Sequence, residues 1–161
     1  MKTKVLMVED DPNWLKIFQT LVGRSTDELF DYVHVGDLAS AIREIRSQSF
    51  GLIFLDLMLP DSQSINTIDI VRKEAIDIPV IVITTLDDEK LIQDAFKLGV
   101  DDYLVKDQYN SEVLVHVSRR ALQRIMSKKA KENIYDDIKT LLASMQKLDS
   151  VLERWEIDNK E

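Results

Sequence analysis

The chain has 161 residues, 45% of them hydrophobic and 31% charged, a balance typical of a globular domain with a core of ordinary size. It contains no cysteine, which excludes disulfides and thiolate metal sites. The formal net charge is −8 and the excess acid lies in residues 1–110, which argues against nucleic acid as the main partner. Because no apolar run suits a signal peptide or a membrane span, we expect a cytoplasmic protein without membrane contact.

Short β-branched runs alternate along the chain with segments of helical spacing. In the first helical segment, for example, Trp14, Phe18 and Leu21 share one face. The strand-like runs are Lys4–Val8, Asp31–Val35, Leu52–Leu55, Val80–Ile83 and Asp102–Val105. Strands that alternate with helices pair in parallel through right-handed crossovers. The pattern therefore predicts an α/β fold with a doubly wound, five-stranded parallel sheet.

Local signals mark where the helices begin and end. Asp11 followed by Pro12 indicates an N-cap with proline at the first helical position, and Asp37 indicates the N-cap of the second helix. Gly23 and Gly99 are placed where helices should stop.

Polar residues follow four of the five runs, and a doubly wound sheet binds its ligands at that edge. The first run ends in Glu9 and Asp10, the third in Asp56, the fourth in Thr84 and the fifth in Lys106. Carboxylates gathered together resist ionisation, and a hard cation relieves their repulsion. Oxygen ligands without cysteine or histidine nearby favour Mg²⁺. Taken alone, each acid is better explained as a cap or a solvated surface charge, but acids that end two separate strands are harder to dismiss in this way.

Four short motifs carry a resemblance to a known family. They are Val8–Asp11, Leu55–Pro60, Ile83–Thr85 and Tyr103–Lys106. In order and spacing they resemble the signature motifs of response-regulator receiver domains, over residues 1–125. The resemblance implies a flavodoxin-like sheet with strand order 2-1-3-4-5, extended by a C-terminal helical segment at residues 126–161. It also implies a two-component pathway, with a histidine kinase as partner and no enzyme activity beyond the domain's own phosphorylation and dephosphorylation.

The resemblance assigns the acceptor and the metal ligands. Asp56 would be the nucleophile that takes the phosphoryl group. Asp10, together with Asp56, would bind Mg²⁺ directly, and Glu9 would act mainly through the ion's water molecules. The backbone carbonyl of Met58 would supply a further oxygen.

Three other residues take roles by the same resemblance. Thr84 would hydrogen-bond one phosphoryl oxygen, and Lys106 would pair with another. Tyr103 matches the aromatic residue that turns inward when the threonine moves toward the phosphate. A tyrosine at the end of a strand that merely packs explains Tyr103 equally well.

The chain departs from the family pattern at three places. Asp107 follows Lys106 where many receivers have proline, and a cis peptide there would cost roughly 3–4 kcal/mol, so we expect a trans bond. Ser64 stands where the loop after the acceptor usually has glycine, which predicts a different loop path. Met58 and Leu86 flank the route of an attacking water with apolar side chains.

The last segment has neither glycine nor proline from Ser111 onward, so the fifth helix can continue without a break. Apolar residues with 4-3 spacing extend over about three heptads, from Ile134 to Trp155. This stripe predicts a coiled-coil homodimer, although packing of the helix within one chain remains an alternative. The segment is too short for an ordinary DNA-binding domain. The stretch from Asp101 to Glu132 resembles receivers whose last helix leads through a linker into a sensor, kinase or cyclase domain. The chain therefore suits both a stand-alone regulator and a piece of a longer one.

Three other function classes compete with the phosphoacceptor. A receiver-like scaffold would dimerise without phosphate, but the complete set of Asp, Thr and Lys argues against it. A haloacid dehalogenase would need an acid two residues after its nucleophile, where this chain has Met58. A flavodoxin-like cofactor carrier is disfavoured, since Glu9 and Asp10 would repel a flavin phosphate.

Overall fold

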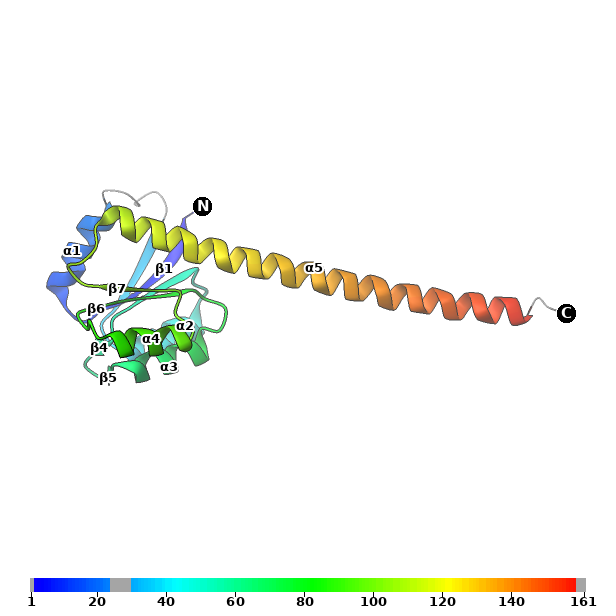
Figure 1. The fold of residues 1–161 in the computed structure, drawn as a ribbon, viewed down its shortest axis with the longest axis horizontal. Helices are drawn as coiled ribbons and strands as arrows, with labels where there is room; N and C mark the ends of the chain where they lie inside the picture. Colours follow the sequence, from blue (N-terminus) through cyan, green and yellow to red (C-terminus); the bar gives the residue numbers. More distant parts are fainter. Residues whose placement is uncertain (1, 24–29, 159–161) are drawn as a thin grey trace. The chain divides into compact units, whose positions relative to one another are not determined.

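A computed structural model describes residues 2–23 and 30–158, and in it strands and helices alternate (Figure 1). The strands are β1 (Thr3–Val8), β2 (Phe30–Val35), β3 (Leu52–Leu55), β4 (Met58–Leu59), β5 (Ser62–Gln63), β6 (Val80–Thr84) and β7 (Asp102–Val105). The helices are α1 (Pro12–Gly23), α2 (Leu38–Ser47), α3 (Ile65–Glu74), α4 (Glu89–Lys97) and α5 (Ser111–Asp158).

The main sheet has five strands in the order β2-β1-β3-β6-β7, and all neighbours pair in parallel. Counted without the short hairpin, this is the order 2-1-3-4-5, so the predicted fold is confirmed. The runs expected from the sequence match these strands to within one residue at each end. The antiparallel hairpin of β4 and β5 was not predicted, because two-residue strands leave no periodic pattern.

Successive residues of each central strand face opposite sides of the sheet and build two apolar layers. Leu6, Ile53 and Val82 pack with α2, α3 and α4 on one side. Phe54 and Ile83 pack with α1 and the first turns of α5 on the other (Figure 1). Because both faces are covered, β3 and β6 are wholly buried, as their apolar sequences predict.

Three of the expected helix signals act as predicted, and the fourth, Gly23, is the last described residue before the gap at 24–29. Asp11 Oδ1 accepts a hydrogen bond from the backbone N–H of Asn13 at 2.9 Å, which caps α1. Asp37 Oδ1 accepts from the N–H of Ser40 at 2.7 Å and caps α2. Gly99 follows α4 at a φ of 89°, a conformation that glycine adopts without the cost of a Cβ atom.

Two departures from the family pattern lie in loops: the peptide bond after Lys106 and the loop at Ser64. No cis peptide bond occurs among the described residues, so the bond after Lys106 is trans as expected, and Asp107 has a φ of 68°. Ser64 has a φ of 61° and a ψ of −140°, and its side chain makes no capping bond to α3. The serine therefore takes a backbone conformation that suits glycine. Its N–H donates to Leu57 O at 2.7 Å, which fixes the loop after Asp56.

The chain divides into two units, with the boundary between Ile125 and Met126. The first contains the sheet, α1 to α4 and the beginning of α5. The second is a single helical segment whose described side chains are almost all exposed. Within residues 2–23 and 30–158, no helix is both long enough and apolar enough to cross a membrane.

Candidate functional site

The carboxyl ends of β1, β3, β6 and β7 bring the predicted polar residues to one edge of the sheet. Glu9 follows β1, Asp56 follows β3, Thr84 ends β6 and Lys106 follows β7. All four are at least nine-tenths buried, in contrast to ordinary surface acids and lysines. The backbone at β1 is fixed, because Glu9 N donates to Val35 O at 2.9 Å.

Lys106 lies at the centre of this edge. Its Nζ donates to Asp56 Oδ2 at 2.8 Å and lies 2.7 Å from Glu9 Oε2. Burial alone would lower the pKa of the ammonium, but the hydrogen bonds to Asp56 and Glu9 outweigh it and raise that pKa above its ordinary value. Lys106 therefore stays charged and offsets the charge of two buried carboxylates.

Glu9 is held from two sides. Its Oε1 accepts from the backbone N–H of Asp11 at 3.0 Å, and its Oε2 pairs with Lys106. Burial raises the pKa of Glu9 to about 6, and the charge of Asp56 acts in the same direction. The hydrogen bonds from Lys106 and Asp11 act against this rise.

Three carboxyl groups are arranged as ligands for a cation. One oxygen each from Glu9, Asp10 and Asp56 lies within 4.8 Å of the others. Asp10 is exposed, so a hydrated ion can reach the cluster from solvent. Oxygen donors of this kind fit a hard cation such as Mg²⁺, which keeps several of its waters. Met58 lies beside them, and its N–H donates to Asp56 Oδ1 at 3.1 Å.

Thr84 is buried, and its hydroxyl makes no hydrogen bond within the described part of the chain. A buried hydroxyl without a partner costs roughly 1–3 kcal/mol, so such groups are rare unless a ligand or water completes them. Thr84 thus provides a free polar group at the edge that carries Asp56 and Lys106.

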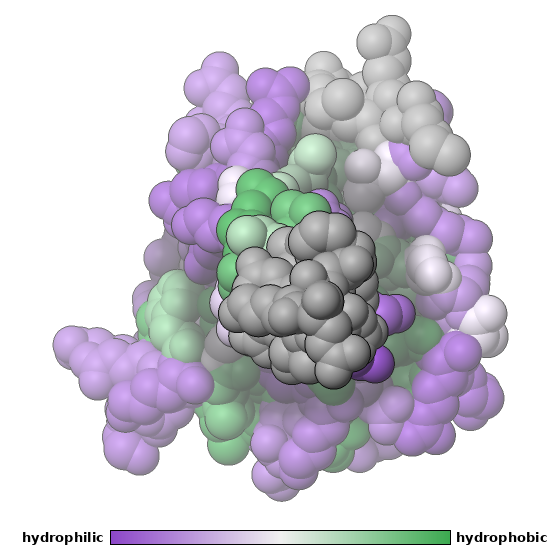
Figure 2. Space-filling model, turned by 90° about the vertical axis from the view of Figure 1, so that its right-hand side faces the viewer, coloured by the Kyte–Doolittle hydropathy of each residue, from purple (hydrophilic) through white to green (hydrophobic). Residues whose placement is uncertain are grey.

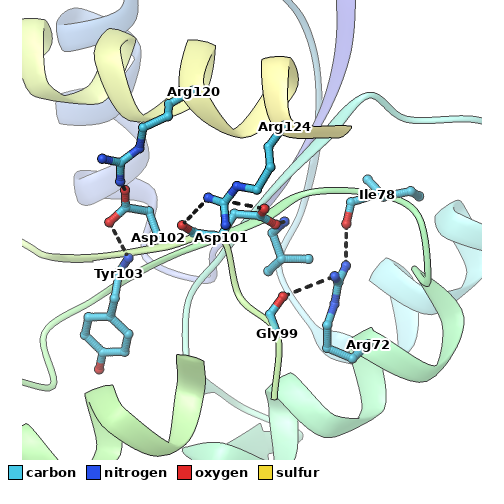
Figure 3. Close-up of polar contacts among 9 residues, drawn as sticks. Arg72, Ile78, Gly99, Asp101, Asp102, Tyr103, Arg120 and Arg124 are labelled. Carbon is cyan, nitrogen blue, oxygen red and sulfur yellow. Dashed lines mark hydrogen bonds and ion pairs between the residues drawn. The ribbon is translucent and has the colours of Figure 1, made fainter. Parts of the chain in front are cut away.

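Tyr103 is half-buried in β7, and its hydroxyl donates to Leu86 O at 2.8 Å. Burial raises its pKa to about 12, so the phenol is neutral at physiological pH. The strand is fastened at its start: Arg120 of α5 pairs with Asp102 at 2.6 Å, and Asp102 Oδ1 accepts from Tyr103 N at 2.9 Å (Figure 3). Arg124 donates to the backbone carbonyl of Asp101 at 3.1 Å and lies 3.6 Å from its Oδ1.

One residue at the site was not predicted as functional. Trp14 was assigned to the buried face of α1, and it does pack there beside Phe18. Its ring also faces the ammonium of Lys106, with 4.5 Å between Nζ and the ring centroid. No short motif connects residues 14 and 106, so only the three-dimensional structure reveals this contact.

Comparisons with known proteins agree with the fold. A family model described as the response regulator receiver domain matches residues 5–118. The transcriptional regulatory protein CiaR of Streptococcus pneumoniae is 34% identical over 118 residues, which are 71% of this chain and 49% of that protein. The probable transcriptional regulator ycf27 of Cyanidium caldarium is 33% identical over 137 residues, 83% of this chain and 52% of that protein. The chain thus spans about half the length of these curated relatives.

Solved structures give the same result. The signal receiver domain of a protein from Vibrio parahaemolyticus superposes with a TM-score of 0.72 at 28% identity, covering 82% of this chain and 98% of that one. The receiver domain of the Francisella response regulator 1452 superposes with a TM-score of 0.66 at 27% identity, covering 76% of this chain and 98% of that one. With the family model over most of the chain and the predicted acidic edge in place, the chain belongs to the response regulator receiver family of two-component systems.

Proposed function

We propose that this protein accepts a phosphoryl group on Asp56 from a histidine kinase, with Mg²⁺ bound at Glu9, Asp10, Asp56 and the carbonyl of Met58. The observation that carries the proposal is the buried ion pair of Lys106 with Asp56, beside an acidic cluster that a divalent cation would complete. Buried charges of this kind are costly to maintain for stability alone, and they are commonly found at functional sites.

The chemistry follows from the atoms around Asp56. One carboxylate oxygen attacks phosphorus, a P–O bond to Asp56 forms, and the bond from phosphorus to the donor atom breaks. Bound Mg²⁺ would supply positive charge to the phosphoryl oxygens. Lys106, which already contacts Oδ2, neutralises a further oxygen. Met58 N holds Oδ1, so the carboxylate is oriented before the donor arrives.

Thr84 and Tyr103 supply the response to phosphorylation in this proposal. The unpaired Thr84 hydroxyl finds its partner in a phosphoryl oxygen. Tyr103 lies on the neighbouring strand and pairs in register with Val82, two residues before Thr84. If Thr84 moves toward the phosphate, the ring of Tyr103 takes the vacated space, and its bond to Leu86 O breaks.

A phosphate-affinity gel tests the acceptor. Protein treated with acetyl phosphate and Mg²⁺ should shift, and the shift should vanish in excess chelator or in the Asp56→Asn variant. Asp61→Asn is the matched control, because Asp61 lies in the same loop region but accepts hydrogen bonds from Leu38 N and Ala39 N instead of joining the site. Full labelling of Asp56→Asn, or labelling without a divalent ion, would refute the assignment.

We further propose that the receiver comprises residues 1–125 and that residues 126–161 form a dimer helix. The described part of the apolar stripe is fully available, since each of its side chains is at least 50% exposed. Its members are Ile134, Ile138, Leu141, Met145 and Leu148. The side chains of Leu152 and Trp155, the last two positions of the pattern, lie outside the described residues. On the face of the molecule that Figure 2 views, green hydrophobic residues are exposed among purple hydrophilic ones.

Pairing with a second copy would bury this stripe. Each apolar side chain taken out of water contributes roughly 1.5–3 kcal/mol, so five from each chain offset an association cost of about 4–15 kcal/mol. Sedimentation of Leu141→Lys should show loss of the dimer, whereas Ala143→Lys, two residues away on the outer face, should leave it intact. Identical monomeric behaviour of wild type and both variants at micromolar concentration would contradict the dimer.

A further inference from the structure

We propose that Trp14 is a positioning residue for the phosphoryl transfer: its indole face is the third wall of a cage that holds the Lys106 ammonium against Glu9 and Asp56. The inference rests on the proposed function and adds a residue that the four sequence motifs do not contain.

The ammonium of the lysine has three close neighbours, and two of them occupy N–H donors. These two are carboxylate oxygens, Glu9 Oε2 at 2.7 Å and Asp56 Oδ2 at 2.8 Å. The Trp14 ring covers the ammonium from another side, with its centroid 4.5 Å from Nζ. A cation within about 6 Å of an indole centroid is attracted by the electron-rich face, and indole is the best of the aromatic rings for this contact. The lysine side chain is only 5% exposed, so little water competes.

The chain fixes the ring as firmly as it fixes the two acids. Asp11 caps α1 through Asn13 N and, through its own N–H, holds Glu9 Oε1 at 3.0 Å. The same turn therefore sets both Glu9 and the start of the helix that carries Trp14. The indole is 6% exposed and packs on Phe18 with 5.4 Å between ring centroids. Phe18 in turn packs edge-to-face on Phe54 of β3 at 5.2 Å.

The indole of Trp14 affects where the Lys106 ammonium lies during the reaction. When Asp56 becomes an acyl phosphate, the negative charge moves from the carboxylate onto the phosphoryl oxygens. The ammonium must then be close enough to contact those oxygens. A lysine side chain has four flexible methylene groups and can otherwise turn away toward solvent. The indole closes that route without offering a competing hydrogen-bond acceptor, so Nζ stays where the transferred group arrives.

Core packing alone would also explain a buried tryptophan, and the variants are chosen to separate the two explanations. Trp14→Leu removes the ring but keeps an apolar side chain. Trp14→Phe keeps a smaller aromatic face and should restore part of the function. Phe30→Leu is the matched control, since Phe30 is 6% exposed in the same cluster and packs its ring on Tyr32, with 6.0 Å between ring centroids.

The measurements are the initial rate of labelling by acetyl phosphate at saturating Mg²⁺ and the NMR shift of the Lys106 ε-methylene protons, which the ring current of Trp14 displaces. We expect Trp14→Leu to label about tenfold more slowly and to lose the displaced shift, whereas Trp14→Phe should lose less of both. Phe30→Leu should keep the wild-type shift and label within about twofold of wild type at a temperature where each variant is folded.

Each outcome decides between the explanations. Wild-type labelling by Trp14→Leu, or equal slowing by Phe30→Leu, would overturn the role of Trp14 while leaving the acceptor assignment intact. Absence of labelling in wild type itself would overturn both. If Trp14→Leu does not fold, the comparison of Trp14→Phe with Phe30→Leu decides by the same two measurements.

Discussion

Replacing Lys106 by methionine should destabilise the protein and at the same time tighten its binding of Mg²⁺. Methionine has a similar length but no charge, so Glu9 and Asp56 would lose the cation that lies 2.7 and 2.8 Å from their oxygens. Both residues are less than 5% exposed, and water cannot replace the ammonium. Removing one partner of a buried ion pair typically costs about 3–5 kcal/mol, which is our estimate for the loss of unfolding free energy in chelator.

The metal should respond in the opposite direction. Lys106 repels a divalent cation from the cluster of Glu9, Asp10 and Asp56, and the variant lacks that repulsion. At an effective dielectric constant of about 20, unit charges about 4 Å apart interact with roughly 4 kcal/mol, so a gain of at least about tenfold in affinity is a conservative expectation. The rate of phosphorylation should nevertheless fall, because the variant has no ammonium to neutralise an oxygen of the transferred phosphoryl group.

Urea denaturation in chelator and in about 10 mM Mg²⁺ measures both effects in one experiment. Mg²⁺ should raise the unfolding free energy of Lys106→Met by about 1.4 kcal/mol more than that of wild type. Lys97→Met is the control, because Lys97 is 73% exposed and pairs with Asp94 away from the site. If Mg²⁺ stabilises Lys106→Met no more than wild type, the lysine and the metal do not share one electrostatic site.

Two further substitutions test the loop and the strand beside the site. Ser64→Gly should stabilise the protein by about 1 kcal/mol and raise Tm by roughly 2–4 °C, since Ser64 has a φ of 61° and makes no capping bond; a lower Tm would show that this backbone is unstrained. Tyr103→Phe should lower the unfolding free energy by about 1 kcal/mol, because the hydroxyl donates to Leu86 O at 2.8 Å. Its initial labelling rate by acetyl phosphate should match wild type, and a large loss of labelling would place Tyr103 in the chemistry itself.

The sequence predicts most of the sheet and its helices, because the five strands of the main sheet are compact apolar runs and α1, α2 and α4 each have a local start or stop signal. Asp37 and Gly99 show this: one caps a helix and the other ends one, as their residue types suggest. The β4–β5 hairpin has two-residue strands, which are too short to show a periodic pattern. It depends on the turn after Asp56, where Ser64 N bonds Leu57 O.

The candidate site is predictable to the extent that its residues end strands. Parallel strands bring their carboxyl ends to one edge, so Glu9, Asp56 and Lys106 meet there for topological reasons. The direct pairing of Lys106 with Glu9 was not predicted, since the resemblance implied a role for Glu9 through metal-bound water. The Trp14 contact was also missed, because a tryptophan on an apolar helix face gives the same pattern whether or not it covers a charge.

The most direct test of the central claim is to locate the phosphoryl group. Protein treated with acetyl phosphate and Mg²⁺ is reduced with borohydride, which converts an aspartyl phosphate to homoserine, and the peptides are sequenced by mass spectrometry. Our account predicts homoserine at position 56, in a yield that falls to background with chelator. Unmodified Asp56 in protein that carries label, or homoserine at another aspartate such as Asp10, would contradict it.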